Sequence, residues 1–315
     1  MHNRLDIEGA RVDFMLAERG RVEDLDVLRD RGYSFDLKVD GIRALVTTSP
    51  AALTMVTRLG SDLTVRFPEL VRALQDVAER SPGSVLDAEI AVPDEHGLPS
   101  WPLTQQRTAQ RSGAAQWATR LPARLYVFDL LQLGDEPVTS WEYSRRRTAL
   151  EELAAHWAAP LSITITSDDP WPLWEVVTQH RLEGVVAKRR TSRYRAGRSP
   201  DWVKVKALRT VSCLVGGVDW GPDADLPAHR RGPPRALELY MVDGAGDLVP
   251  IGRVGAAASG PLRRDLLAGL AKPPLIVEVE YSEITTAGRL RQPVLRRVRT
   301  DLGVLDCGTD QLAGP

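Results

Sequence analysis

The segment Lys38-Val39-Asp40-Gly41-Ile42-Arg43 combines residue types that could carry out chemistry on a nucleotide. A lysine amine can attack a phosphate when neighbouring groups bind the nucleotide. Gly41 could permit a tight turn, and Arg43 could hold a ribose or a phosphate. The same six residues could equally form a surface turn between strands, with the lysine and the arginine in solvent. The hexapeptide alone leaves both interpretations open.

Charged residues also occur inside segments whose pattern predicts apolar strands. Asp87 and Glu89 lie within residues 85–92, where a buried carboxylate requires a cation, a metal ion or a ribose hydroxyl. Alternatively, one carboxylate faces water and the other forms a salt bridge. Phe128 lies in a similar segment and could stack on a base, although core packing would also explain a single phenylalanine.

One more acid and two lysines complete the candidate set. Glu183 begins the sequence Glu-Gly-Val-Val-Ala-Lys, and Lys204 and Lys206 alternate on a predicted strand, so both lysines face the same side. Two ammonium groups repel each other unless an anion, such as a triphosphate, lies between them. Such a pair is also a source of the lowered lysine pKa that nucleophilic attack requires.

These residues must be positioned by strands and helices, which the spacing of apolar residues predicts. In the first two-thirds of the chain we expect strands over 33–37, 44–48, 53–57, 85–92, 123–133, 183–188 and 201–208. Helices are predicted over 67–80, 144–155 and 171–181, and 21–31 indicates a short helix or loop. The order of elements favours antiparallel hairpins over repeated strand–helix–strand units.

The pattern changes after about Leu208. Short strands are predicted over 211–218, 236–242, 248–254 and 275–282, with one helix over 261–270. About five short strands with one helix are typical of a small barrel such as an OB-fold. We therefore predict an α+β protein with two domains: residues 1–207 form mixed, largely antiparallel sheets, and residues 208–315 form an OB-fold β-barrel.

The composition is that of an ordinary globular protein, with 315 residues and a net charge of −1. No apolar run approaches the roughly 20 residues that span a bilayer. The two cysteines, Cys213 and Cys307, match no metal-binding spacing. A cytoplasmic location and no membrane association are expected.

Basic residues are concentrated in two places. Residues 181–210 hold ten basic residues against two acidic ones. A second cluster consists of Arg289, Arg291, Arg296, Arg297 and Arg299. In a chain with so little net charge, two such clusters favour dedicated phosphate contacts over an ordinary solvated surface.

The motifs, taken in order, resemble a known family. They are Lys-Val-Asp-Gly-Ile-Arg at 38–43, Thr-Arg-Leu-Gly at 57–60, Asp-Ala-Glu at 87–89, Val-Phe-Asp at 127–129, Glu-Gly-Val-Val-Ala-Lys at 183–188 and Lys-Val-Lys at 204–206. This order resembles the covalent nucleotidyltransferases, and among them the bacterial ATP-dependent DNA ligases of the end-joining type. Further similar segments are 13–17, 194–198, 202–206, 288–293 and 299–301.

The resemblance implies a nucleotidyltransferase (adenylation) domain and a three-step reaction. Lys38 would attack the α-phosphate of ATP, release pyrophosphate and form a lysyl-AMP phosphoramidate. AMP would then pass to a 5′-phosphate at a nick in double-stranded DNA. Attack by the 3′-hydroxyl would form the phosphodiester bond and release AMP.

The resemblance also implies roles for individual residues. Asp36 and Phe128 would recognise adenine, although the family more often has Glu at the position of Asp36. Arg43 and Arg58 would hold the sugar and phosphates, and later the 5′-phosphate of the nick. Glu89 would bind ribose or act at the metal, and Glu183 would bind a divalent ion, Mg²⁺ or Mn²⁺. The remaining contacts would be those of Lys204 and Lys206 with the α-phosphate and of Arg299 with pyrophosphate.

The sequence departs from the family at Leu302, where a lysine normally follows the aspartate of the last motif. The missing ammonium group predicts weak contacts with the β- and γ-phosphates. Self-adenylation should therefore be slow relative to nick sealing.

Two other functions remain to be weighed. One is an RNA ligase or capping-type guanylyltransferase, and the other is a non-catalytic nick-binding protein, which only Leu302 suggests. For the ligase we expect a monomer with end-joining or repair proteins as partners, associated with the bacterial nucleoid. A chain of this length is expected to hold the catalytic core without a large DNA-clamping, polymerase or nuclease domain.

Overall fold

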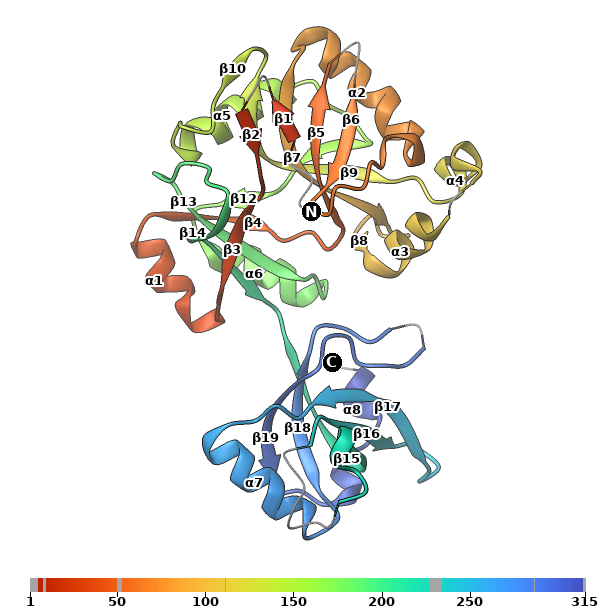
Figure 1. Ribbon diagram of the computed structural model, residues 1–315. Helices are drawn as coiled ribbons and strands as arrows, with labels where there is room; N and C mark the ends of the chain where they lie inside the picture. Colours follow the sequence, from red (N-terminus) through yellow and green to blue (C-terminus); the bar gives the residue numbers. More distant parts are fainter. Residues whose placement is uncertain are drawn as a thin grey trace. The chain divides into compact units, whose positions relative to one another are not determined.

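The computed structural model of the chain describes residues 5–7, 10–49, 53–110, 112–226, 234–285 and 287–313. The chain divides into two compact units, Met1–Ala207 and Leu208–Pro315 (Figure 1). The first unit contains two sheets with helices, and the second contains a closed barrel. A short hairpin of β1 (Leu5–Ile7) and β2 (Ala10–Val12) precedes them.

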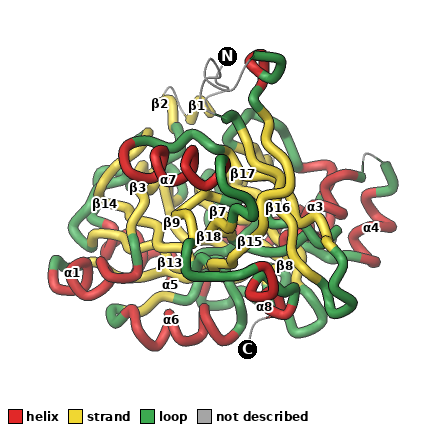
Figure 2. The backbone as a smooth tube through the Cα atoms, turned by 90° about the horizontal axis from the view of Figure 1, so that it is seen from below, coloured by secondary structure: helices red, strands yellow, loops and turns green. Residues whose placement is uncertain are grey.

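The first unit has a five-stranded sheet in the order β12-β4-β13-β14-β3. Its strands are β3 (Met15–Gly20), β4 (Tyr33–Leu37), β12 (Thr166–Ser167), β13 (Gly184–Arg189) and β14 (Gly197–Lys206). Helices α1 (Leu25–Asp30) and α6 (Pro170–Gln179) pack on it through apolar side chains that include Leu25, Phe35 and Leu173 (Figure 2). The side chain of Asp169 caps the start of α6, where Pro170 takes the first position.

A seven-stranded sheet follows the order β10-β9-β7-β5-β6, with β11 beside β9 and β8 beside β7. Its strands are β5 (Ile42–Thr48), β6 (Thr54–Thr57), β7 (Ser84–Pro93), β8 (Pro99–Ser100), β9 (Arg124–Leu133), β10 (Glu136–Pro137) and β11 (Leu161–Ile163). Helices α2 (Pro68–Arg80) and α5 (Tyr143–Ala154) pack on it through Leu70, Leu74 and Leu150. This unit also has α3 (Trp101–Ala109), α4 (Ala114–Arg120) and the 3-10 helices η1 (Val22–Asp24) and η2 (Thr64–Arg66).

The two sheets share a layer of buried side chains. Met15 and Trp202 come from the five-stranded sheet, and Leu45, Val85 and Leu131 come from the seven-stranded sheet. Each sheet therefore carries helices or loops on its outer face and contributes to a common interior on the other. The polar groups described below lie in the same layer.

The segment that carries Lys38 crosses from one sheet to the other. β4 pairs with β12 and β13, whereas β5 pairs with β6 and β7, so residues 38–41 connect two sheets and do not form a hairpin turn. Gly41 is needed for close approach: a Cβ atom there would lie 2.4 Å from the carbonyl oxygen of Ile90. Gly41 is therefore not part of a tight turn. It lies where the chain crosses from one sheet to the other, and its backbone packs closely against β7.

The second unit is a barrel in the order β15-β16-β17-β19-β18. Its strands are β15 (Arg209–Asp219), β16 (Ala236–Val242), β17 (Leu248–Gly255), β18 (Ile276–Tyr281) and β19 (Val294–Arg299). Helix α7 (Gly260–Leu270) lies between β17 and β18 in the chain, and the unit also has η3 (Gly221–Asp223), η5 (Val304–Asp306) and α8 (Asp310–Ala313). Inward side chains such as Val211, Leu237 and Tyr281 fill the interior.

The sequence predicted this architecture in outline. The α+β class and the largely antiparallel sheets are confirmed, and each predicted strand and helix corresponds to an observed element. The pattern missed β3, β19, α3 and α4, as well as the short elements β1, β2, β8, β10, β11, β12 and α8. Among these, β3 and β19 are rich in charged residues, which hides the alternation of a strand.

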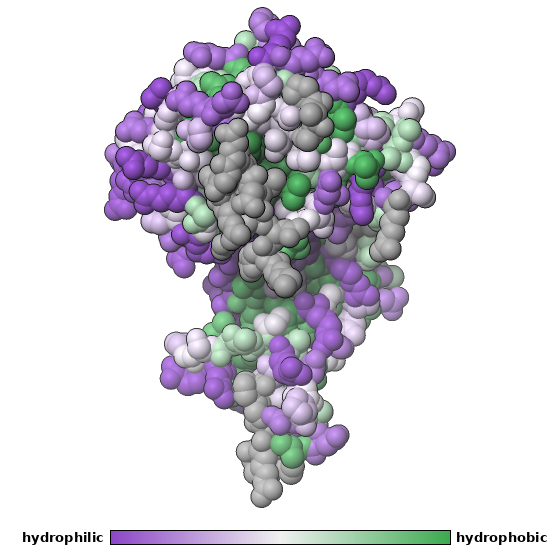
Figure 3. All heavy atoms as spheres, turned by 45° about the horizontal axis from the view of Figure 1, so that its top comes forward, coloured by the Kyte–Doolittle hydropathy of each residue, from purple (hydrophilic) through white to green (hydrophobic). Residues whose placement is uncertain are grey.

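Among the residues that the structure describes, no helix has the length and apolar character needed to cross a bilayer. On the face that Figure 3 shows, hydrophilic residues cover most of the first unit and hydrophobic residues lie scattered among them.

A buried ion pair in the first unit yields a stability prediction. Asp129 accepts two hydrogen bonds from Arg146, at 2.8 and 2.9 Å, and neither side chain is exposed. Asp129→Asn would leave the guanidinium without its counter-charge and should lower the free energy of unfolding by about 3–5 kcal/mol, measured by urea denaturation.

The control is Asp168→Asn, which breaks an exposed pair with Arg190 and should cost less than about 1 kcal/mol. Equal losses in the two variants would contradict the importance of the buried pair.

Candidate active site

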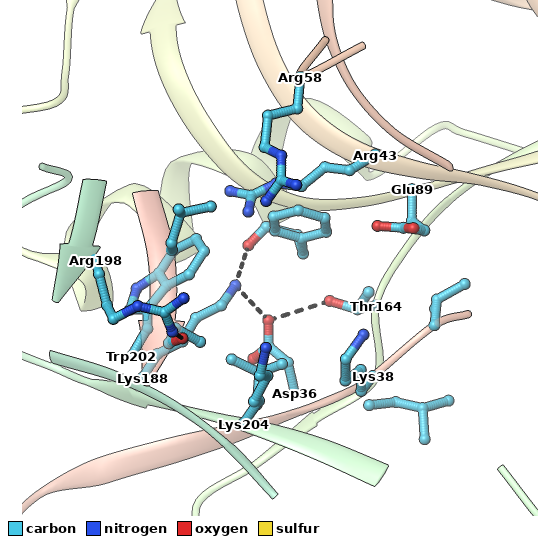
Figure 4. Close-up of a pocket in the computed structure, with 16 residues that line it drawn as sticks. Asp36, Lys38, Arg43, Arg58, Glu89, Thr164, Lys188, Arg198, Trp202 and Lys204 are labelled. Carbon is cyan, nitrogen blue, oxygen red and sulfur yellow. Dashed lines mark hydrogen bonds and ion pairs between the residues drawn. The ribbon is translucent and has the colours of Figure 1, made fainter. Parts of the chain in front are cut away.

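A cavity of about 190 Å³ lies in the first unit and gathers most of the predicted site residues (Figure 4). Those that line it are Asp36, Lys38, Arg43, Arg58, Glu89, Phe128 and Lys204. Lys38 and Asp36 come from the five-stranded sheet, whereas Arg43, Glu89 and Phe128 come from the seven-stranded sheet. The cavity therefore opens where the two sheets meet.

Glu183 joins this group through ion pairs. Its Oε2 lies 2.7 Å from Lys38 Nζ, and its Oε1 lies 2.9 Å from Lys206 Nζ. The backbone N–H of Lys38 donates to the carbonyl of Gly184, which brings the end of β4 against the start of β13. Gly184 is needed there because its φ is +140° and a Cβ would lie 2.1 Å from the carbonyl oxygen of Val205.

The charges around Lys38 correct one expectation. Burial alone would lower the pKa of Lys38, but the carboxylates of Glu183, Glu89 and Asp40 together outweigh burial and the pKa is raised. Burial alone would raise the pKa of Glu183, but Lys38 and Lys206 hold it below its usual value. The expected lowered pKa occurs instead at Lys204, through partial burial and the neighbouring ammonium groups of Lys206 and Lys38. In the chain by itself, the prediction of a lowered pKa for Lys38 is wrong.

The pKa of Glu89 is shifted in the opposite direction to that of Glu183. Its carboxyl makes no hydrogen bond or ion pair within the described parts of the chain, and it lies on the same side of the cavity as Lys38 (Figure 4). Burial raises the pKa of Glu89 to about 8, although Lys38 and Arg43 act against the shift. At neutral pH this carboxyl is therefore largely protonated.

Asp87, for which the sequence indicated no particular partner, fixes the side chain of Arg43. Asp87 accepts from Arg43 Nε at 2.9 Å and from Arg43 Nη2 at 2.6 Å, and the hydroxyl of Tyr194 donates to Asp87 at 2.7 Å. The guanidinium also lies 5.3 Å from the ring centre of Phe128 and 5.0 Å from that of Phe14. The structure therefore favours the salt-bridge reading for Asp87, with Arg43 held in one orientation at the cavity wall.

Asp36 forms the centre of a second buried network. Lys188 donates to its Oδ2 at 2.7 Å and Thr164 donates to the same oxygen at 3.3 Å. Tyr143 donates to Oδ1 at 2.8 Å, and the hydroxyl of Thr166 is also hydrogen-bonded to Oδ1. The predicted adenine-reading carboxylate is thus already bonded within the chain.

Two further cations border the cavity with few partners. Arg58 is exposed and makes no ion pair with another described residue, and Arg198 donates only to the carbonyl of Ala17. Arg58 and Arg43 both line the cavity (Figure 4). The exposed Arg193 and Arg195 lie in the segment just before β14, which carries Arg198, and likewise lack carboxylate partners among the described residues.

Arg299 belongs to the second unit, where it is part of an ion-pair ladder. It binds both oxygens of Asp301 at 2.8 Å and Glu278 at 3.1 Å. Three other members of the second basic cluster are also paired: Arg291 with Glu283, Arg296 with Glu280 and Arg297 with Glu278. These four cations are neutralised within the barrel, so the expectation of free phosphate contacts does not hold for them. Arg289, the fifth member, is exposed and has no ion pair with a described residue.

The sequence missed several cavity residues. Lys188, Arg198 and Trp202 lie in segments that resemble the family, but nothing in the pattern gave them a role. The scarcity of lysine could have pointed to Lys188. The chain has only five lysines, and four of them lie at this site: Lys38, Lys188, Lys204 and Lys206. Thr164 had no signal, since an isolated threonine in a loop resembles any other.

The relationship to known proteins follows from the same region. The family model described as ATP dependent DNA ligase domain matches residues 14–206, which include the whole cavity. The chain belongs to this ligase family.

Curated relatives of this ligase chain include proteins named for end joining. It is 33% identical over 312 residues to the multifunctional non-homologous end joining protein LigD of Mycobacterium bovis, covering 91% of this chain and 38% of that protein. The chain thus spans about two fifths of the length of the curated relatives it matches.

Solved structures agree with the family. The ligase domain of M. tuberculosis LigD is 30% identical, with a TM-score of 0.57, covering 94% of this chain and 97% of that one. A mycobacterial DNA ligase D complexed with ATP and MES is also 30% identical, with a TM-score of 0.54, covering 92% and 96%. The ligase chain is therefore similar to the ATP-dependent, end-joining branch of the family.

The raised pKa of Glu89 predicts a pH-dependent stability. Between the usual pKa of 4.5 and about 8, the folded chain keeps a proton that the unfolded chain has lost, so the stability of the wild type falls as pH rises. Glu89→Gln cannot ionise and escapes this loss. Its Tm relative to wild type should therefore increase by a few degrees between pH 5 and pH 8.5, measured by calorimetry.

The control is Glu95→Gln, at a position where the side chain is 87% exposed. Parallel profiles of Tm against pH for wild type and Glu89→Gln would argue against a buried, protonated Glu89.

Proposed function

We propose that the chain is an ATP-dependent DNA ligase that seals nicks with a 3′-hydroxyl and a 5′-phosphate through a lysyl-AMP on Lys38. The observation that carries the proposal is the lysine amine held 2.7 Å from Glu183 at a cavity bordered by Arg43, Arg58 and Lys204. Nucleotidyl transfer depends on positioning and on neutralising phosphate charge, which such a set of cations supplies. Each AMP transfer breaks one phosphate bond as it forms another, and AMP leaves in the last step.

The raised pKa of Lys38 adds a requirement to the first step. In the chain by itself the side chain is an ammonium ion paired with Glu183. It must pass this proton to Glu183, its hydrogen-bond partner, or to water before its lone pair can attack the α-phosphate. The pair with Glu183 holds the amine at the cavity, and loss of the proton is a requirement separate from the binding of ATP, whose negative charge would favour the ammonium form.

The remaining site residues take proposed roles from their positions. Arg43 and Arg58 bind ribose and phosphates and later the 5′-phosphate of the nick, and Lys204 and Lys206 bind the α-phosphate. Phe128 stacks on adenine from the cavity wall. Arg299 orients pyrophosphate, for which it must leave its partners Asp301 and Glu278.

The carboxylates fit a divalent cation, Mg²⁺ or Mn²⁺. Oxygen ligands suit these ions, which commonly take one or two carboxylates together with substrate phosphates and water. Glu89 is the better candidate, because its half-buried carboxyl has no hydrogen-bond or ion-pair partner among the described residues. Since its pKa is about 8, the carboxyl would release a proton as the ion binds. Glu183 would complete the pair of ligands. When bound, the ion would neutralise charge on the triphosphate.

We further propose that residues 1–207 are the adenylation domain and that residues 208–315 are an OB-fold. In support, the second unit closes five strands with a helix between its third and fourth strands, as expected for a small barrel of this class.

Nicked double-stranded DNA is the proposed partner. Arg193 and Arg195 are the proposed phosphate contacts outside the nucleotide site, and Arg198 is a proposed phosphate contact at its border. Binding should be strongly salt-dependent. The relatives named for non-homologous end joining suggest repair proteins as further partners. We propose a monomer in the cytoplasm, associated with the nucleoid.

The nucleophile is tested by labelling. Wild-type protein incubated with α-labelled ATP should carry covalent label that nicked duplex DNA removes, with sealing of the nick. Lys38→Ala should carry no label, and Lys272→Ala, at an exposed lysine in the second unit, should behave as wild type. Covalent label on Lys38→Ala would overturn the mechanism, and preferential use of GTP or nicked RNA would favour the alternative enzymes.

Leu302 is tested by restoring the ammonium group. Leu302→Lys should adenylate faster than wild type, because the added charge can bind the β- and γ-phosphates. Leu302 is half-buried against Leu214, Val242 and Ile276, so Leu302→Met serves as the control that keeps the packing. Equal rates for wild type and Leu302→Lys would show that the lost lysine does not limit self-adenylation.

A further inference from the structure

The carboxylate of Asp36 has no free acceptor position. A carboxylate offers about four lone-pair directions, and the structure fills two on each oxygen, Oδ1 by Tyr143 and Thr166 and Oδ2 by Lys188 and Thr164. The side chain of Asp36 is 1% exposed. An adenine amino group that approached it would have to displace a donor that is already bound.

A hydrogen bond from Arg147 orients the hydroxyl of Thr164 toward Asp36. Arg147 donates to Thr164 Oγ1 at 3.4 Å and to its carbonyl at 2.9 Å, so the hydroxyl proton is directed to the Asp36 carboxylate. The network therefore continues away from the cavity, into α5.

Lys188 connects Asp36 to Phe128 and Trp202 in the wall of the cavity. Its ammonium group donates to Asp36 Oδ2 and to the carbonyl of Phe128, both at 2.7 Å (Figure 4). It also lies 4.8 Å from the Phe128 ring centre and 4.6 Å from that of Trp202. Because Lys188 is only 1% exposed, its charge depends on the Asp36 carboxylate.

The geometry points to Asp36 as a positioning residue: through Lys188 it fixes the backbone of Phe128, and it makes no contact with the nucleotide base. Asp36 and Lys188 belong to β4 and β13 of one sheet, and Phe128 belongs to β9 of the other. The proposal gives Lys188 a role and replaces base recognition as the role of Asp36. It rests on the proposed adenylation of Lys38, which wild-type labelling by ATP tests separately.

The test compares wild type and Asp36→Asn, each with two nucleotides that differ in the 6-amino group. Single-turnover adenylation of Lys38 is measured with ATP and with purine riboside 5′-triphosphate, which has hydrogen in place of the 6-amino group. Asp36→Asn should slow the reaction by on the order of 10- to 100-fold with both nucleotides, leaving their ratio within about twofold of wild type. A defect that is present with ATP and absent with the analogue would place Asp36 on the base and overturn the proposal.

Lys188→Met supplies the second arm, because it removes the ammonium group and keeps the length of the stem. Its defect should match that of Asp36→Asn, and the double variant should be no slower than either single variant. Multiplicative defects would contradict a shared path through Lys188. Asp168→Asn, at the exposed pair with Arg190, is the control and should retain wild-type rates.

If Asp36→Asn does not fold, Asp36→Glu keeps the charge and still decides the question. The longer carboxylate cannot satisfy all four donors, so adenylation should slow equally with ATP and the analogue. A selective gain with ATP would show that the side chain at position 36 contacts the base.

Discussion

The ion pair between Asp36 and Lys188 is the interaction on which the arrangement of the cavity depends. Both side chains are buried where two sheets face each other, so neither charge can be left without the other. The Lys188 ammonium group extends the pair to the Phe128 carbonyl on the opposite sheet. Asp87, which accepts a hydrogen bond from Tyr194, likewise holds Arg43. In both cases an aspartate that is hydrogen-bonded by a tyrosine fixes a cation at the cavity wall.

The cavity contains more cationic groups than carboxylates, and the chain balances them in different ways. Lys38 and Lys206 share Glu183, whereas Arg58 and Lys204 have no carboxylate partner among the described residues. For an anion that enters the cavity, binding to Lys38 or Lys206 competes with their ion pairs to Glu183. Binding to Arg58 or Lys204 displaces no carboxylate of the described residues. This difference explains why Lys38 is charged and Lys204 has a lowered pKa at the same site.

The sequence predicted the strands that carry Lys38 and Lys204 because their apolar residues alternate, and motif order predicted most cavity residues. It could not show that residues 33–37 and 42–48 belong to different sheets, since alternation does not identify the neighbour of a strand. It misjudged the pKa of Lys38 because the deciding group, Glu183, lies 145 positions away. The donors to Asp36 come from three separate segments, so its saturation is visible only in three dimensions.

The crossing at residues 38–41 separates two properties of the site. Lys38 lies at the start of this crossing and pairs with Glu183, just before β13 of the five-stranded sheet, while Arg43, Glu89 and Phe128 lie in the seven-stranded sheet. A substitution at Phe128 can therefore reshape the cavity wall without touching the Lys38–Glu183 pair, whereas a substitution at Glu89 also changes the charge that acts on Lys38. Fit and nucleophile protonation are thus open to separate selection at some wall positions and coupled at others.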